Sequence, residues 1–120
     1  MTEEQPFESR LDRRTDVILI HLYGELNSAA AEAFNMAYAE ALQEHPSMIA
    51  MDFANVSYIN SSGIAMIIRL ITGARRAGYR LAAYGLTKHF AELFNITRIS
   101  EYMVIYESEE SLFIEINSDR

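Results

Sequence analysis

The chain has 120 residues and no cysteine, and its formal net charge is −7. The length suits one domain with a sizeable core, and the lack of cysteine excludes disulfides, thiolate catalysis and cysteine-based zinc sites. The acidic balance argues against a nucleic-acid partner, because phosphates are bound by clustered Lys and Arg. The polar, acidic N-terminus is unlike a secretory signal, and no segment has the length of a membrane span. We therefore expect a soluble cytoplasmic protein without membrane insertion.

The N-terminal third predicts two strands and a helix. Residues 7–11 alternate weakly, residues 12–16 are typical of a turn, and residues 17–23 form a nearly continuous apolar run, as in a strand buried on both faces. His21 lies inside that run, where a packed, hydrogen-bonded histidine is commoner than a catalytic one. Residues 29–44 favour a helix, which Asn27 or Ser28 would cap.

The rest of the chain continues the alternation of strands and helices. In order, it predicts a strand at 48–53, a connection, a helix from about 61 to 77, a strand at 80–84, a helix after Thr87, a strand at 103–106 and a final helix after Ser108. Strands that alternate with helices indicate a single α/β domain with a substantially parallel sheet.

The junction between strand 48–53 and the helix after it carries the most informative residues. Asn60, Ser61 and Ser62 can each cap a helix, because a short side-chain oxygen accepts from the free amides of the first turn. Ser61 should then lie at a helix N-terminus, where unpaired N–H groups and the helix dipole favour an added phosphate. The run has two interpretations: one of its hydroxyls accepts a phosphate, or its residues only cap the helix.

The helix after Ser61 should be amphipathic. Its main apolar stripe is predicted at Ile64, Ile67, Ile68 and Ile71, opposite the polar residues Arg69, Thr72 and Arg76. A second apolar flank comprises Met66, Leu70 and Gly73. This flank is either a wide contact with the core or a part-exposed patch within reach of Ser61, as a partner-binding surface would need.

One basic cluster stands out in this acidic chain. It comprises Arg69, Arg75, Arg76 and Arg80. We interpret it as the solvated face and C-terminal turn of a helix, where cations complement the helix dipole.

The run from Met51 to Ile64 resembles a known signature. Members of the STAS domain family of bacterial anti-sigma factor antagonists carry a buried strand ending in Asp, a short connection, and Asp-Ser-Ser/Thr-Gly-Leu at the start of the second helix. In this chain the strand holds Asp52, and the helix begins with Asn60-Ser61-Ser62-Gly63-Ile64. Gly24-Glu25-Leu26 matches the family's Gly-Glu-Leu-Asp, and residues 97–112 follow its closing pattern. The resemblance covers about residues 8–114.

The resemblance implies an α/β fold with a mixed sheet of four or five strands and about four helices packed mainly on one side. A single STAS domain would occupy residues 8–116, between an N-terminal tail at 1–7 and a C-terminal tail at 117–120.

The resemblance also implies a phosphorylation switch on the first Ser of the motif, which is Ser61 here. The surroundings of the phosphate would be formed by Asn27, Asn60, Ser62 and Gly63.

In that family, the unphosphorylated antagonist binds an anti-sigma factor, often a serine kinase, and so frees the sigma factor. The kinase phosphorylates the antagonist and ends the interaction, and a serine phosphatase resets it. We expect this chain to act as such a partner-switching regulator of transcription, as a monomer or weak dimer and without metal or cofactor. Its binding surface would comprise Ser61, Ile64, Met66, Arg69 and Leu70.

The sequence departs from the family pattern near the expected site. Asn60 and Asn27 replace the usual acids, which keeps hydrogen bonding but removes two negative charges from near Ser61. A phosphate on Ser61 should be tolerated at least as well as in family members that carry the acids. Recognition by a kinase that binds those acids should change. The family's Thr-Gly after the third helix is Thr97-Arg98 here, which affects only that turn.

Other classes of function have weaker support. A nucleophile elbow at Ser61 would need Gly at position 59, which is Ile59, and the three His residues are scattered. No motif for a metal or a nucleotide appears, so we do not expect an enzyme. The main alternative is a STAS scaffold or sensor subunit, which would act by protein contact without phosphate on Ser61.

Overall fold

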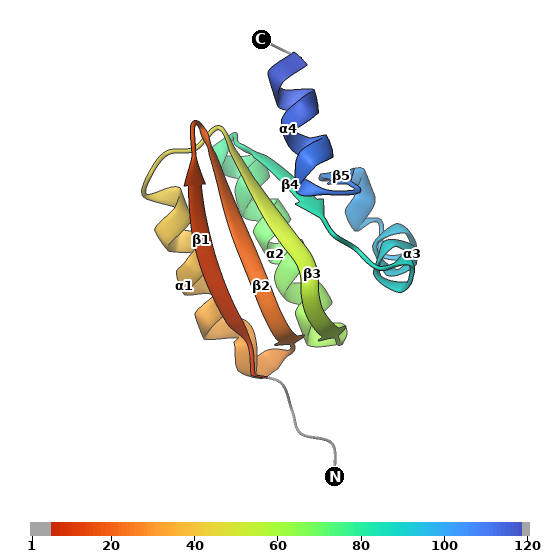
Figure 1. Ribbon diagram of the computed structural model, residues 1–120. Coiled ribbons are helices and arrows are strands. Elements are labelled where there is room, and N and C mark those ends of the chain that lie inside the picture. Colours follow the sequence, from red (N-terminus) through yellow and green to blue (C-terminus); the bar gives the residue numbers. More distant parts are fainter. Residues whose placement is uncertain (1–5, 119–120) are drawn as a thin grey trace.

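The structure is a computed structural model that describes residues 6–118. A five-stranded sheet has the strand order β1-β2-β3-β4-β5, the same as the order along the chain (Figure 1). The strands are β1 (Glu8–Arg14), β2 (Val17–Leu26), β3 (Met48–Ile59), β4 (Arg80–Tyr84) and β5 (Val104–Tyr106). The α-helices are α1 (Ala31–Leu42), α2 (Ser61–Ala77), α3 (Lys88–Ile96) and α4 (Glu109–Ser118), and the short 3-10 helices are η1 (Ser28–Ala30) and η2 (Ile99–Glu101).

The sheet is mixed, as the family resemblance implied, and mostly parallel, as the alternation of strands and helices predicted. β1 pairs with β2 in antiparallel fashion, and the pairs β2–β3, β3–β4 and β4–β5 are parallel. β1 continues through most of the turn expected at residues 12–16, so the hairpin turn is reduced to Thr15 and Asp16. Asp16 has a φ of 64°, in the left-handed region that Asp tolerates better than most residues.

The core lies mainly between the sheet and the helices on one of its faces. Buried side chains of β2, β3 and β4 form one cluster with those of α1, α2 and α3, and within it the Phe53 and Phe94 rings meet edge to face at 5.4 Å. α4 packs on the opposite face, where Leu112 is fully buried against the other side of the same strands. The fold therefore confirms the α/β prediction, with the helices mainly on one side.

β3 is longer than the sequence indicated. Residues 54–59, expected to be a connection, continue the strand and pair with the end of β2, up to the pair Leu26 and Ile59. Two register shifts interrupt this pairing, so the residues do not alternate regularly and the strand pattern is hidden. The extension brings the ends of β2 and β3 side by side, which places Asn27 and Asn60 at the same edge of the sheet.

The chain ends differ slightly from the expected tails. Phe7, placed in the N-terminal tail by sequence, packs its ring against Phe34 with the centroids 6.2 Å apart. α4 continues to Ser118, past the expected domain boundary at 116. Residues 1–5 and 119–120 of the expected tails lie outside the described residues.

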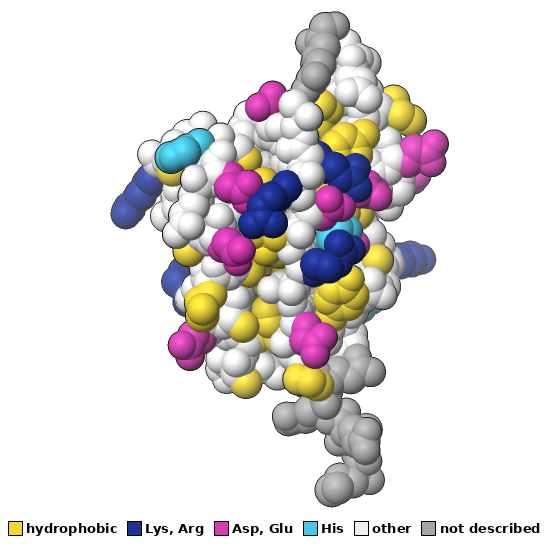
Figure 2. Space-filling view, turned by 60° about the vertical axis from the view of Figure 1, so that its left-hand side comes forward, with side chains coloured by type: hydrophobic (Ala, Val, Ile, Leu, Met, Phe, Trp, Pro, Cys, Tyr) yellow, Lys and Arg dark blue, Asp and Glu magenta, His cyan; other side chains and the backbone are white. Residues whose placement is uncertain are grey.

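Acidic and basic side chains are interspersed on the side of the molecule that carries β1 (Figure 2). Arg13 of β1 pairs with Glu40 of α1 and with Glu44 in the turn that follows α1. Arg14 pairs with Asp12 at 2.9 Å and with Glu109 of α4 at 3.0 Å. The arginines of this side are thus largely balanced by carboxylates.

His21 is a packed and hydrogen-bonded residue. Its Nδ1 lies 2.7 Å from Oδ2 of Asp52, and both residues are buried. Oδ1 of Asp52 accepts from the Ala54 amide at 2.9 Å, and His21 Nε2 lies 3.7 Å from Asp12, whose pKa is lowered by its hydrogen bond to Arg14. Since the pair links β2 to β3 inside the sheet, we interpret it as structural.

We expect Tyr84→Phe to leave the free energy of unfolding unchanged or to raise it by about 1 kcal/mol at pH 7. Among residues 6–118, nothing is in hydrogen-bonding position for the buried Tyr84 hydroxyl, so its removal leaves no partner unsatisfied. Burial, aided by the Asp52 charge, raises the Tyr84 pKa, so the unfolded chain ionises first and stability falls above about pH 10. Urea unfolding at pH 7 and above pH 10 should show a smaller alkaline loss in the variant. A clear loss of stability at pH 7 would contradict this account.

None of the described helices combines the length and the apolar character needed to cross a membrane. Within residues 6–118, no group of three or more His, Asp or Glu side chains is placed to hold a metal ion.

Candidate functional site

The site is built around the N-terminus of α2, which Asn60 caps. Asn60 has an extended backbone, and its Oδ1 accepts from the Gly63 amide at 3.0 Å. Its own amide donates to the Leu26 carbonyl at 3.2 Å. Of the three candidate caps, the structure therefore uses Asn60, and Ser61 is the first residue of the helix. This arrangement ties the start of α2 to the end of β2.

Ser61 is exposed at this helix N-terminus. Because an α-helical amide bonds four residues back, the Ser61 and Ser62 amides have no acceptor within the helix, and the Asn60 side chain serves only Gly63. The first turn contains no acidic residue. A phosphate on the Ser61 hydroxyl would meet free N–H groups and the positive end of the helix dipole.

Gly63 lies where α2 touches the end of β2. A Cβ at this position would lie 2.2 Å from the Leu26 carbonyl oxygen and 3.0 Å from Cγ2 of Ile59. No side chain fits there without displacing backbone. The glycine of the motif thus allows the helix to begin directly against the two strand ends, which fixes where Ser61 projects.

The other expected neighbours of the phosphate are arranged around the same edge. Asn27 caps η1, since its Oδ1 accepts from the Ala29 amide at 3.0 Å, and its Nδ2 donates to Glu25 at 3.2 Å. Both bonds stay within its own loop. Ser62 is half-buried, so it is less accessible to a modifying enzyme than the exposed Ser61.

The expected binding flank at Met66 and Leu70 is wrong. Met66 is 3% exposed and Leu70 is 5% exposed, so both belong to the core and cannot form a surface for a partner. Ile68, expected in the core stripe, is 44% exposed. Arg69 is exposed and Ile64 half-buried, so these two expected members remain accessible.

Helix geometry explains the correction. Each residue turns the helix by about 100°, so Ile68 returns to the side of Ser61 after about two turns, while Met66 and Leu70 fall on the opposite side. The buried residues are Gly63, Met66, Ile67, Leu70, Ile71 and Ala74. The helical spacing of Ile68 from Ser61 and Thr72 could have shown that Ile68 lies on the exposed side. The run of isoleucines instead suggested an apolar stripe that included Ile68.

We expect Ser61→Asp to change the free energy of unfolding by less than about 1 kcal/mol. The side chain is exposed, and a carboxylate there meets the same free amides and dipole as a phosphate would. Urea unfolding of the wild type and the variant checks this. A loss of several kcal/mol would show that Ser61 is required for packing.

The sequence profile of the STAS domain matches residues 8–112, which cover both strand ends, the capped helix and the sheet that holds them. The chain belongs to the STAS domain family. The Asn60-Ser61-Ser62-Gly63 segment at the start of α2 lies within the matched residues.

Among curated STAS proteins, the anti-sigma-B factor antagonist of Listeria monocytogenes is 26% identical over 98 residues, which cover 82% of this chain and 86% of that protein. Among solved structures, the anti-sigma factor antagonist SpoIIAA in its unphosphorylated form superposes with a TM-score of 0.71 at 18% identity, covering 92% of this chain and 98% of the other. The phosphorylated form of SpoIIAA from Bacillus gives a TM-score of 0.69 at 18% identity, covering 91% and 99%. These structures share the fold.

Proposed function

We propose that this STAS domain is a phospho-regulated anti-sigma factor antagonist. The unphosphorylated domain binds an anti-sigma factor with serine kinase activity. Phosphorylation of Ser61 by that kinase ends the interaction, and a serine phosphatase restores the unphosphorylated domain. The observation that carries the proposal is an exposed serine at the N-terminus of α2, with free amides beside it. Relatives that are named anti-sigma factor antagonists and match over 86% or more of their own length support the antagonist role. In this proposal the domain is a binding module in the cytoplasm, not an enzyme.

The binding surface in this proposal is the exposed side of α2 from Ser61 onward. It comprises Ser61, Ile64, Ile68, Arg69 and Thr72, all exposed or half-buried. Such a surface pairs a phosphoacceptor with apolar area that a partner can cover.

A phosphate on Ser61 would act on binding rather than on folding. It brings a charge of about −1.5 to −2, which the helix N-terminus tolerates while water surrounds it. When a partner without a matching cation covers it, the phosphate loses water without compensation, which costs several kcal/mol. Because each 1.4 kcal/mol is tenfold in affinity, a weakening of about a hundredfold or more is expected.

Asn27 and Asn60 bear on which kinase can act here. Both side chains are used as caps, so the amide replaces the family's acid without loss of the capping bond. With fewer negative charges near Ser61, we expect the cognate kinase to rely less on basic residues for recognition.

The test is calorimetric titration of the unphosphorylated and Ser61-phosphorylated forms against the cognate anti-sigma factor. Fragmentation mass spectrometry of the protein from its native cell should first locate the phosphate on Ser61. Ser61→Ala should bind permanently and Ser61→Asp should bind at least about a hundredfold more weakly. Phosphate only on another residue, or equal affinities for all forms, would refute the switch and favour the scaffold or sensor alternative.

A further inference from the structure

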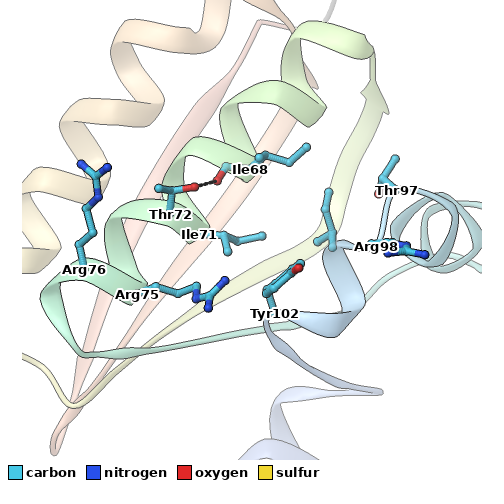
Figure 3. A pocket seen from close by; sticks show the side chains of 9 residues that line it. Ile68, Ile71, Thr72, Arg75, Arg76, Thr97, Arg98 and Tyr102 are labelled. Carbon is cyan, nitrogen blue, oxygen red and sulfur yellow. Dashed lines mark hydrogen bonds between the residues drawn. The ribbon is translucent and has the colours of Figure 1, made fainter.

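A groove runs between α2 and the segment that follows α3, and it encloses about 560 Å³. Ile71 and Ile99 form its buried floor, and Ile68 and Thr97 form its walls. At one end, the Arg75 guanidinium lies over the Tyr102 ring, 5.2 Å from its centroid. Figure 3 shows Arg75 reaching toward Tyr102, while Arg76 points away from the groove. We call this hollow, defined by these residues, the Arg75 groove.

The Arg75 groove joins the surface proposed to bind a partner. Ile68 is both a wall of the groove and part of the exposed side of α2. Beyond Arg75 and Tyr102, a second hollow continues to Arg80. A protein that covers α2 from Ser61 onward would therefore meet an apolar hollow with Arg75 at its end, and then a second hollow that carries Arg80 and Glu101.

The charge of this region differs from that of the rest of the chain. The net charge is −7, yet α2 contains Arg69, Arg75 and Arg76 and no acidic residue. Within residues 6–118, no carboxylate pairs with any of these arginines, whereas Arg13 and Arg14 on the β1 side are paired. Within these same residues, the Arg75 guanidinium lies over the Tyr102 ring and donates to no carboxylate, so its N–H groups remain available.

We propose that the Arg75 groove binds an acidic, amphipathic segment of the protein partner. An apolar side chain of that segment would enter between Ile68 and Ile99, and a carboxylate following it would pair with Arg75. Charge complementarity supports this occupant, since an acidic segment is attracted to unpaired arginines and steered away from the acidic remainder of the chain. The inference rests on the proposed function, because it gives the chemistry of the partner that Ser61 would release.

The probe is a short synthetic peptide with leucines and glutamates on one helical face, compared with the same peptide carrying lysine for glutamate. Titration into isotopically labelled protein, followed by amide chemical shifts, should move Ile68, Thr97 and Tyr102 with the acidic peptide only. Raising the salt concentration should weaken binding, because exposed charges are screened.

Variants make the assignment specific. Arg75→Gln and Ile68→Ser, both at exposed positions, should each weaken binding of the acidic peptide by about tenfold. The control Arg10→Gln removes one positive charge from β1 and should bind as the wild type does. Equal binding of both peptides, shifts confined to other surfaces, unchanged affinity in Arg75→Gln, or no saturable binding at millimolar peptide would each overturn the proposal.

This test is independent of the phosphate. It uses neither the cognate partner nor a modified Ser61, so the groove can bind the acidic peptide even if the Ser61 switch fails. Conversely, a working switch with no peptide binding would locate the partner's main contacts on α2 outside the Arg75 groove.

Discussion

Gly63→Ala should lower the free energy of unfolding by about 3 kcal/mol or more. The added Cβ would lie 2.2 Å from the Leu26 carbonyl oxygen, a distance that no relaxed structure allows. The Leu26 carbonyl belongs to backbone held by β2 pairing, and the Cβ would be bonded directly to backbone held by the Asn60 cap, so neither atom can rotate away. The helix propensity gained by Ala, about 1 kcal/mol, offsets only part of this cost.

Gly73 provides a matched control in the same helix. Among the described residues outside its own turn of helix, a Cβ there would have only the Tyr38 hydroxyl oxygen near it, at 4.0 Å. Gly73→Ala should therefore stabilise the protein by up to about 1 kcal/mol. Urea unfolding of the two variants separates the cost of the contact between residue 63 and Leu26 from the gain in helix propensity, which both variants share. Equal effects would show that the contact with β2 does not constrain the start of α2.

The order of elements could be predicted because each one has a local signal. The apolar run at 17–23, the cap at Asn60 and the end of the helix near residue 77 each depend on neighbours in sequence, and each is found in the structure, where Gly78 caps the end of α2. The end of β3 could not be predicted in this way. Its residues 54–59 are strand only because β2 lies beside them, with two register shifts that break the alternation of side chains.

The candidate site was predictable in part for the same reason. The position of Ser61 follows from capping chemistry, which is local. The Arg75 groove was not foreseen, because it requires α2 and the residues after α3 to approach each other. From the sequence, Arg75 was interpreted as part of a basic cluster on the solvated face of a helix, and no role was predicted for Tyr102. Helix spacing alone could have placed Ile68 on the same side of α2 as Ser61, but not in the groove.

Met66→Glu and Ile68→Glu should separate folding from binding. The two positions are two residues apart on α2 but face opposite ways, with Met66 3% exposed and Ile68 44% exposed. Met66→Glu places a carboxylate in the core without a partner, so the free energy of unfolding should fall by about 3 to 5 kcal/mol. Ile68→Glu leaves its carboxylate in water, so stability should change by no more than about 1 kcal/mol.

Ile68→Glu should weaken partner binding directly, without an effect on folding. Ile68→Glu keeps Ser61 and the fold intact but puts an unpaired charge on the surface that the partner covers, so affinity for the anti-sigma factor should fall about a hundredfold. An acidic partner segment would add like-charge repulsion to that loss. Urea unfolding gives the stability of both variants, and calorimetric titration gives the affinity of the folded Ile68→Glu protein. Undiminished binding by Ile68→Glu would exclude the exposed side of α2 as the partner's surface, because no protein could cover Ser61 and Thr72 without also covering the residue between them.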